Sequence, residues 1–291
     1  MSSDIMPMTE PRPRRQLSQG SGATDAALLF DEPGPRGRIL IAIGSVVAVI
    51  GIAALAAAVL YRLDLAGQLD YPKWRYFLGQ SVVSQLLEAA GTTLTLGGVA
   101  AVLTFPLGIA LGWLRLLDNR PIKWLIGLWI DAMRAVPMLL LVYFFLLVVP
   151  RFATISDFWK LALPIVMCTS ATTAEVFRSG VRALDRGQTE AAWALGMSPS
   201  LTMRLILAPQ ALRLMLPTLV TQMVTIIKGT TLAYVLAYPE LMYRGSTMIG
   251  QAKIDAHLSV FFQTYVIIAV LYIIVNWSLG ALARYIESRT R

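Results

Sequence analysis

Long apolar stretches separated by short polar segments run through the whole chain. Three stretches without any charged residue exceed the roughly 20 residues that a helix needs to cross the hydrocarbon of a bilayer. They cover residues 39–61, 89–114 and 258–283. Three further stretches have only one or two internal charges, and they cover residues 124–150, 160–182 and 214–238. The pattern predicts an all-α integral membrane protein with six transmembrane helices.

The composition agrees with this interpretation. Hydrophobic residues make up 56% of the 291 positions and charged residues 14%, against about 25% charged in soluble domains. The single cysteine, Cys168, cannot form an internal disulfide. Together with the single histidine, His257, it is too little for the ligand set of a typical zinc site. A soluble domain and a disulfide scaffold are therefore excluded, and no metal site is expected.

The positive charges favour one orientation of these helices. A net charge of +8 can indicate nucleic-acid binding. However, if the six helices alternate in direction, most of the 25 lysines and arginines fall on the side that carries both termini. The positive-inside rule then places the two termini in the cytoplasm. The basic excess is thus explained by orientation in a plasma membrane, without nucleic acid.

The chain is expected to divide into four parts. Residues 1–37 are rich in Pro, Ser, Arg and Gln and lack an apolar period, which predicts a disordered cytoplasmic tail. Residues 38–62 form an extra amino-terminal transmembrane helix, because the apolar run is too long for the core of a signal peptide. Residues 63–88 are predicted to be an external loop. Residues 89–291 hold the remaining spans.

One cytoplasmic loop, residues 184–213, has the local chemistry of two short helices. Asp185 and Gln188 stand at capping-box-like spacing, and Gly196 can end the first helix in a left-handed conformation. Ser198 followed by Pro199 is a helix cap with the favoured first-turn proline. These residues predict a helix, a glycine corner and a second helix. Local chemistry alone leaves an ordinary folded loop as the alternative.

The same loop carries a resemblance to a known family. Glu190-Ala191-Ala192, then Gly196, and then Ile206 and Pro209 are similar to the EAA motif of permease subunits of binding-protein-dependent ABC importers. Ala208 departs from the motif, which usually has leucine there. Further matches point to the polar amino-acid uptake branch of that family, and they are Gly91-Thr92-Thr93-Leu94, Arg134-Ala135-Val136-Pro137, Ala174-Glu175 with Arg178 and Gly180, and Gly187-Gln188.

The resemblance implies a type I importer core of five helices, preceded here by the extra helix. It also implies that the loop forms a coupling helix in contact with an ATPase subunit, through Glu190, Ala191, Ala192, Trp193 and Gly196. The expected partners are an ABC ATPase dimer, a second permease chain, an extracytoplasmic binding protein and membrane lipid. The sequence has no Gly-Lys dipeptide and hence no P-loop. The chain is therefore expected not to be an enzyme and to hold no cofactor, with ATP and Mg on the ATPase partner.

Charged and hydroxyl side chains within the spans are candidates for a substrate pathway. Charges are costly in hydrocarbon and should face protein or water. The candidates are Arg134, Glu175, Lys228, Thr230 and Thr231. Two alternatives remain open: Arg134 can pair with Asp131 and Lys228 with Glu175, and the small and hydroxylated residues around Gly229 can serve helix packing alone.

The expected substrate is a polar amino acid. The segment before the first helix, and the extra helix itself, resemble the larger permease subunit of glutamate importers from Gram-positive bacteria. That resemblance favours glutamate or aspartate, and the intramembrane cations agree with an anionic solute. Glutamine or a basic amino acid is the alternative. A secondary transporter would lack the EAA loop, and a membrane assembly protein would tolerate its scrambling.

Overall fold

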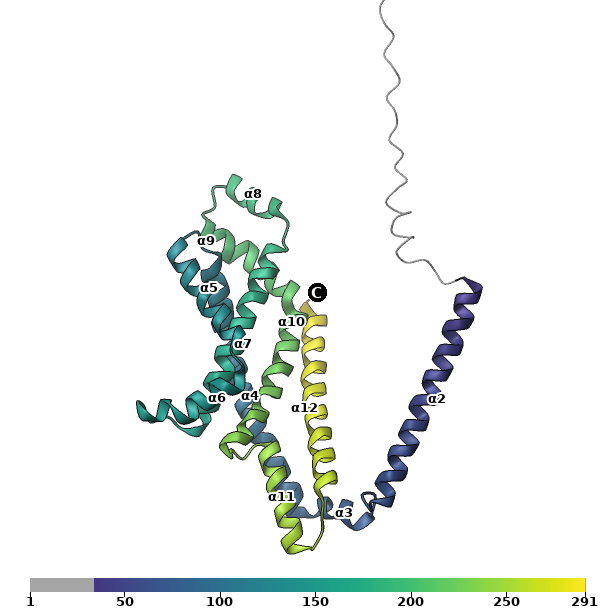
Figure 1. Cartoon of the computed structure of the whole chain (residues 1–291). Coiled ribbons are helices and arrows are strands. Elements are labelled where there is room, and N and C mark those ends of the chain that lie inside the picture. The colour runs from purple at the N-terminus through teal and green to yellow at the C-terminus, as the bar shows by residue number, and fades with distance from the viewer. Residues whose placement is uncertain (1–33, 291) are drawn as a thin grey trace, which may run out of the picture. The chain divides into compact units, whose positions relative to one another are not determined.

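The computed structural model describes residues 34–290, and every regular element within them is helical (Figure 1). The chain divides into two compact units, Met1–Ala66 and Gly67–Arg291. Most of the predicted tail, residues 1–37, lies outside the described residues. The first described helix begins at Pro35, three residues earlier than predicted.

The first unit contributes one long helix, α2 (Pro35–Leu65). Its 31 residues reach about 46 Å at 1.5 Å per residue, enough to cross a bilayer. The mean hydropathy of its most apolar window is 2.8, and none of that window is buried. The helix is apolar on all sides rather than on one face, as is typical of a membrane-spanning helix.

The second unit is a bundle of helices with short irregular connections. Its elements are α3 (Tyr71–Arg75), η1 (Tyr76–Leu78), α4 (Gln80–Leu116), α5 (Arg120–Ala135), α6 (Met138–Leu147), η2 (Val149–Arg151), α7 (Asp157–Arg182), α8 (Arg186–Ala194), α9 (Pro199–Thr202), the π-helical η3 (Met203–Leu207), α10 (Ala208–Gly229), η4 (Thr230–Leu236), α11 (Leu241–Asp255) and α12 (Phe261–Thr290). Within this unit, α8 and α9 lie at the end opposite to α3 and α11 (Figure 1).

Four helices of the described residues are long and apolar enough to cross a membrane, and a bent pair makes a fifth. The pair is α5 and α6, which meet at 95°. The prediction of one continuous span over residues 124–150 was therefore wrong. Pro137 disfavours the helical conformation at Val136, and both residues are extended there, with ψ of 128°.

The centre of the second unit is α7, which contacts α4, α5, α6 and α10. It is 26 residues long, enough to cross a bilayer at 1.5 Å per residue, but it is not apolar enough to be among the spans counted above. Glycines let α4 approach it closely. A Cβ on Gly112 would lie 2.7 Å from the Ala174 carbonyl oxygen, and one on Gly108 would lie 2.6 Å from the Thr173 Cβ. The contact also includes a hydrogen bond of 2.8 Å between the hydroxyls of Thr104 and Thr169.

Residues 63–88, predicted to be an external loop, are instead largely helical. They contain the end of α2, then α3, η1 and the first turns of α4. The reason is apolar burial: Phe77, Val82 and Leu86 pack in one cluster with Met248 of α11 and Val260. A solvent-exposed loop would leave these side chains in water.

The sequence did not predict α11, the helix that follows α10 and η4. Glu240 begins it, because its fully buried carboxylate accepts hydrogen bonds from the N–H groups of Met242 (2.9 Å) and Tyr243 (2.8 Å). The Tyr272 hydroxyl of α12 donates to the same carboxylate at 2.7 Å. This cap fixes the start of α11 against α12.

Candidate functional site

The predicted helix at the EAA motif is α8, and its start follows from the residue types. The Asp185 carboxylate accepts a hydrogen bond from the Gly187 N–H at 2.7 Å, so Asp185 is the helix cap that the sequence predicted. Gln188 does not complete a capping box. Its amide oxygen instead accepts from the Gln210 amide at 3.3 Å, which ties α8 to α10.

The end of α8 is a Schellman motif centred on Gly196, as expected from the sequence. The Gly196 N–H donates to the Trp193 carbonyl (2.9 Å), and the Met197 N–H donates to the Ala192 carbonyl (3.1 Å). Gly196 has a φ of +75°, which side-chain-bearing residues adopt only with strain. The corner that turns the chain from α8 to α9 therefore depends on a glycine.

The second helix begins at Ser198 and Pro199, also as predicted. The Ser198 hydroxyl accepts from the Leu201 N–H at 3.4 Å, and Pro199 occupies the first turn. The chain then continues through the π-helical η3 into α10 without leaving a helical path. The second helix of the EAA loop is thus continuous with the helix that carries Lys228, and α8 joins it through the Gly196 corner.

The surface of α8 separates inward-facing from outward-facing residues of the motif. Ala192 is only 1% exposed and packs against its own chain. Glu190 and Ala191 are exposed. Trp193 is 56% exposed, and Leu195, which follows it, is 82% exposed. Two large apolar side chains thus lie uncovered beside an acidic one at the tip of the unit.

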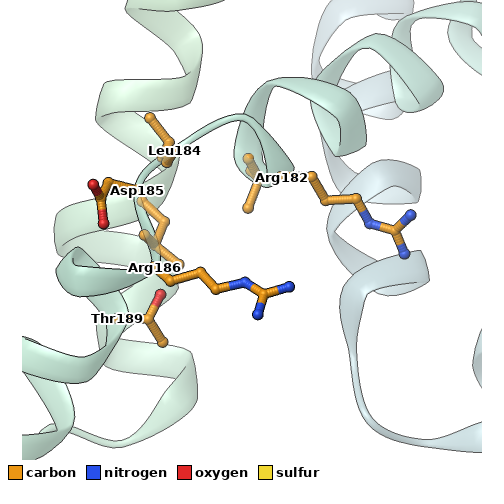
Figure 2. Close-up of a pocket in the computed structure, with 7 residues that line it drawn as sticks. Arg182, Leu184, Asp185, Arg186 and Thr189 are labelled. Atoms are coloured by element: carbon orange, nitrogen blue, oxygen red, sulfur yellow. The ribbon is translucent and has the colours of Figure 1, made fainter. Parts of the chain in front are cut away.

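A cavity of about 510 Å³ lies at the base of this loop, where α7 ends and α8 begins (Figure 2). Its walls include Arg182, Leu184, Arg186 and Thr189. The side chains of Arg182 and Arg186 extend in the same direction, whereas Asp185 points to the other side (Figure 2). Two arginines against the single carboxylate of Asp185, which caps α8, give the cavity a net positive charge.

A network of four charged side chains ties α4, α5 and α7 together. Arg115 of α4 bonds Asp131 of α5 at 3.1 Å and Glu175 of α7 at 2.9 Å. Arg178, one turn along α7, bonds the other oxygen of Glu175. Three of the four side chains are only about a fifth exposed or less. The network therefore holds these helices in one register beside the loop.

The network gives Glu175 and Asp131 partners other than those considered from the sequence. Among the described ion pairs, neither the Arg134–Asp131 pair nor the Lys228–Glu175 pair occurs. The residue that sequence reasoning missed is Arg115. It directly follows the uncharged stretch 89–114. Its position one residue beyond a span was the available signal.

Arg134 and Glu175 face a common cavity of about 420 Å³ between α5, α7 and α10. Thr172, Ser179 and Thr218 add hydroxyl groups to its walls. Arg134 is exposed and has no ion pair among the described residues. Because α5 ends at Ala135, the guanidinium lies beside the break in the span. The cavity combines an unpaired cation with several hydrogen-bonding groups.

The other three candidates do not line that cavity. Lys228 is exposed near the end of α10. Thr230 is fully buried, and its hydroxyl donates to the Ile227 carbonyl at 2.7 Å. Thr231 donates to the Lys228 carbonyl at 2.7 Å. The helix narrows from α to 3-10 form at Gly229 and Thr230, so the backbone is locally irregular there.

Close packing accounts for the small residues at this point. A Cβ on Gly229 would lie 3.3 Å from the Met138 sulfur of α6. On α4, a Cβ on Gly97 would lie 2.3 Å from Ile227. The hydroxyls of Thr230 and Thr231 are satisfied within their own helix. Both hydroxyls donate within the chain, and a contact of either threonine with solute stays a prediction.

Comparison with known proteins identifies the family. Residues 104–291 match the family described as "Binding-protein-dependent transport system inner membrane component". The chain belongs to this family. The match includes α7, the α8 loop and all later helices, and it begins within α4.

Relatives within this permease family include proteins named for amino-acid transport. The chain is 34% identical over 198 residues to the probable glutamine ABC transporter permease protein GlnP of Bacillus subtilis, covering 68% of this chain and 89% of that protein. It is 33% identical over 230 residues to the glutamate transport system permease protein GluD of Corynebacterium glutamicum, covering 77% and 82%.

Solved structures of ABC transporters share the fold. An amino acid ABC transporter crystallised with histidines has a TM-score of 0.64 at 24% identity, covering 72% of this chain and 95% of that one. The inward-facing methionine transporter MetNI has a TM-score of 0.61 at 15% identity, covering 73% and 99%. At these identities the likeness concerns the fold alone.

Proposed function

We propose that this protein is the permease subunit of an ATP-driven importer that moves a polar amino acid, glutamate or aspartate first, into the cytoplasm by alternating access. The observation that carries the proposal is the α8 loop, in which the EAA residues form a capped helix with exposed Trp193 and Leu195 and a glycine corner. A surface of this kind, joined through the Gly196 corner and α9 to a spanning helix, can transmit the movement of a partner.

The partner is an ABC ATPase. Glu190 supplies acceptors for its cationic or amide groups, and Ala191 allows close approach. Trp193 adds apolar area, and Gly196 sets the angle of the following helix. Ala192 contributes indirectly: it is buried against its own chain and so holds α8 in place. ATP and Mg belong to that ATPase, since this chain has no Gly-Lys for a P-loop, and the permease itself holds no cofactor.

The substrate pathway begins from the cavity of Arg134 and Glu175. Glu175 already bonds two arginines, so its negative charge is balanced within the chain. Arg134 keeps its positive charge available to a carboxylate of the solute, and the nearby hydroxyls can bond its polar groups. Lys228, Thr230 and Thr231 act from outside this cavity. Lys228 meets solute at an earlier or later stage, and the two threonines shape the helix break.

The proposed assembly has two permease chains, two ATPases and an external binding protein. The α8 end faces the cytoplasm, together with both termini, because that arrangement places most basic residues inside. The second permease is a related chain. Movement of the ATPase dimer would rock α10 through α8 and α9, to which it is directly joined.

Uptake by proteoliposomes tests the proposal. The permease, its co-purifying ATPase and the binding protein are reconstituted with ATP inside, and labelled glutamate is offered with unlabelled aspartate, glutamine or arginine as competitors. We expect ATP-dependent glutamate uptake that aspartate inhibits. Uptake that needs only an ion gradient would contradict the importer, and inhibition by glutamine alone would replace glutamate with the substrate named for the Bacillus subtilis relative.

A substitution of Arg134 tests whether its cavity belongs to the substrate pathway. Arg134→Gln should raise the KM for glutamate about tenfold or more, since a charge-assisted hydrogen bond contributes roughly 1.5–3 kcal/mol. Arg151→Gln, at an exposed arginine outside the cavity, is the matched control and should leave KM unchanged. Equal KM values for the two variants would remove Arg134 from the pathway.

A further inference from the structure

A third cavity lies between α4, α5 and α7, and it is separate both from the substrate cavity of Arg134 and from the cavity at the base of α8. Its volume is about 330 Å³, and it is lined by Arg115, Lys123 and Arg178 as cations, by Asp131 as the single acid, and by Trp124 and Leu128 as apolar walls. Arg115 and Arg178 are engaged with carboxylates. Lys123 is exposed and has no ion pair among the described residues.

The charge at this cavity favours an anion. Asp131 balances one of the three lining cations, and Glu175, behind Arg115 and Arg178, balances a second. The third positive charge, that of Lys123, has no counterion within the described chain. A group with a single negative charge would therefore neutralise the cavity.

The position of the cavity is that of a lipid headgroup. Arg115 follows directly on the uncharged stretch 89–114, so it lies where α4 leaves hydrocarbon. The turn after α4 meets α9, because Leu117 and Asp118 share a small cavity with Pro199 and Ser200. The basic cavity is therefore at the polar end of the bundle, close to the α8 loop.

The adjoining surface of α5 is apolar, which distinguishes a lipid from a small ion. Trp124 is 69% exposed, and Leu125 and Leu128 are exposed on the same helix. Tryptophan is the residue that settles at the boundary between headgroups and hydrocarbon. A ligand with a charged head and apolar chains would meet cations first and then this face of α5.

We infer that the cavity of Arg115, Lys123 and Arg178 binds the phosphodiester headgroup of an anionic phospholipid, whose acyl chains lie along Trp124, Leu125 and Leu128. Basic pockets between transmembrane helices bind such headgroups. The ligand bridges the ends of α4, α5 and α7, the same three helices that the ion-pair network joins. An anionic lipid thus belongs to the structure that positions the α8 loop.

Native mass spectrometry of the full-length protein in neutral detergent tests this assignment. The protein is titrated with phosphatidylglycerol or with phosphatidylcholine of the same acyl chains. We expect tighter binding of phosphatidylglycerol. Lys123→Gln should weaken it about fivefold, the effect of one basic residue near an anionic headgroup, and should leave phosphatidylcholine binding unchanged. Lys123→Arg keeps the charge and should retain binding.

Lys253→Gln is the matched control, because Lys253 is an exposed lysine on α11 at the opposite end of the unit. It should not change phosphatidylglycerol binding. Equal affinities for the two lipids, or equal losses in Lys123→Gln and Lys253→Gln, would overturn the proposal. So would displacement of phosphatidylglycerol by millimolar inorganic phosphate, since the site would then take a free anion rather than a lipid.

Discussion

Two helices of span length, α2 and α7, show opposite relations between apolarity and burial. In α2 the most apolar window has a mean hydropathy of 2.8, and none of it is buried. In α7 the side chains are less apolar, yet Leu161, Ile165 and Phe177 are almost completely buried. The helix whose window is the more hydrophobic is thus the one without buried residues in that window.

This difference follows from the fact that the solvent around a membrane-spanning helix is lipid rather than water. In a bilayer, lipid is as apolar as leucine, so hydropathy marks contact with lipid, whereas small and polar residues mark contact with other helices. The serines, threonines and alanines of α7 allow close approach, and the glycines of α4 complete the contact. Three pairs of matched substitutions, placed in α2, α4 and α7, test this difference.

The largest effect is expected from removing a buried ring. Phe177→Ala leaves a cavity where α7 packs with Ala208, Ala211 and Met215, and large-to-small changes of this kind cost about 3–5 kcal/mol. The counterpart Leu55→Ala in α2, at a side chain 66% exposed, should change stability by less than about 0.5 kcal/mol. Thermal unfolding in detergent, with loss of monodispersity as the signal, measures the stability of both variants. Similar shifts would abolish the distinction between the helices.

The next effect comes from adding a single methyl group. Gly112→Ala places a Cβ 2.7 Å from the Ala174 carbonyl oxygen, which is backbone and cannot move freely. Overpacking costs typically 1–3 kcal/mol, so the apparent melting temperature should fall. Gly51→Ala in α2 meets nothing within 4 Å, and it should leave that temperature unchanged or raise it. A stable Gly112→Ala protein would contradict the close contact of α4 with α7.

The smallest effect concerns two charges of α7, one at its first residue and one about two turns before its end. Glu175→Gln leaves Arg115 and Arg178 without a shared carboxylate, and we expect a loss of about 2 kcal/mol, below the range for fully buried pairs. Asp157→Asn breaks only the exposed pair with Lys160, whose carboxylate side is 62% exposed, so at most about 1 kcal/mol is lost. Urea unfolding compares the two variants, and a larger loss in Asp157→Asn would be inconsistent with a structural network.

The parts of the fold that the sequence predicted are those set by local chemistry. Asp185, Gly196 and Ser198 each act on backbone groups within three residues, and each lies in the predicted role. Long uncharged runs likewise predict helices whatever surrounds them. The spacing of the EAA motif then indicated the family, because fixed residue types at fixed distances can be recognised without a structure.

The predictions that the structure corrected concern residues whose partners are distant in the chain. Phe77 becomes helical and buried because Met248 lies opposite, and Glu175 pairs with Arg115, sixty residues away. Gln188 prefers Gln210 to the backbone of its own helix. The break at Pro137 could have been predicted, since the residue before a proline avoids the helical conformation. The contacts of α8 with an ATPase stay a prediction, because they involve a second protein.

The ratio of ATP hydrolysed to amino acid transported tests the central claim most directly. Gly196→Ile puts a β-branched residue at a φ of +75° and should misdirect the corner between α8 and α9. Gly250→Ile, in open space on α11, is the control. We predict that Gly196→Ile proteoliposomes keep ATPase activity and membrane assembly but lose most uptake, while the control transports normally. An unchanged ratio in Gly196→Ile would contradict coupling through this loop.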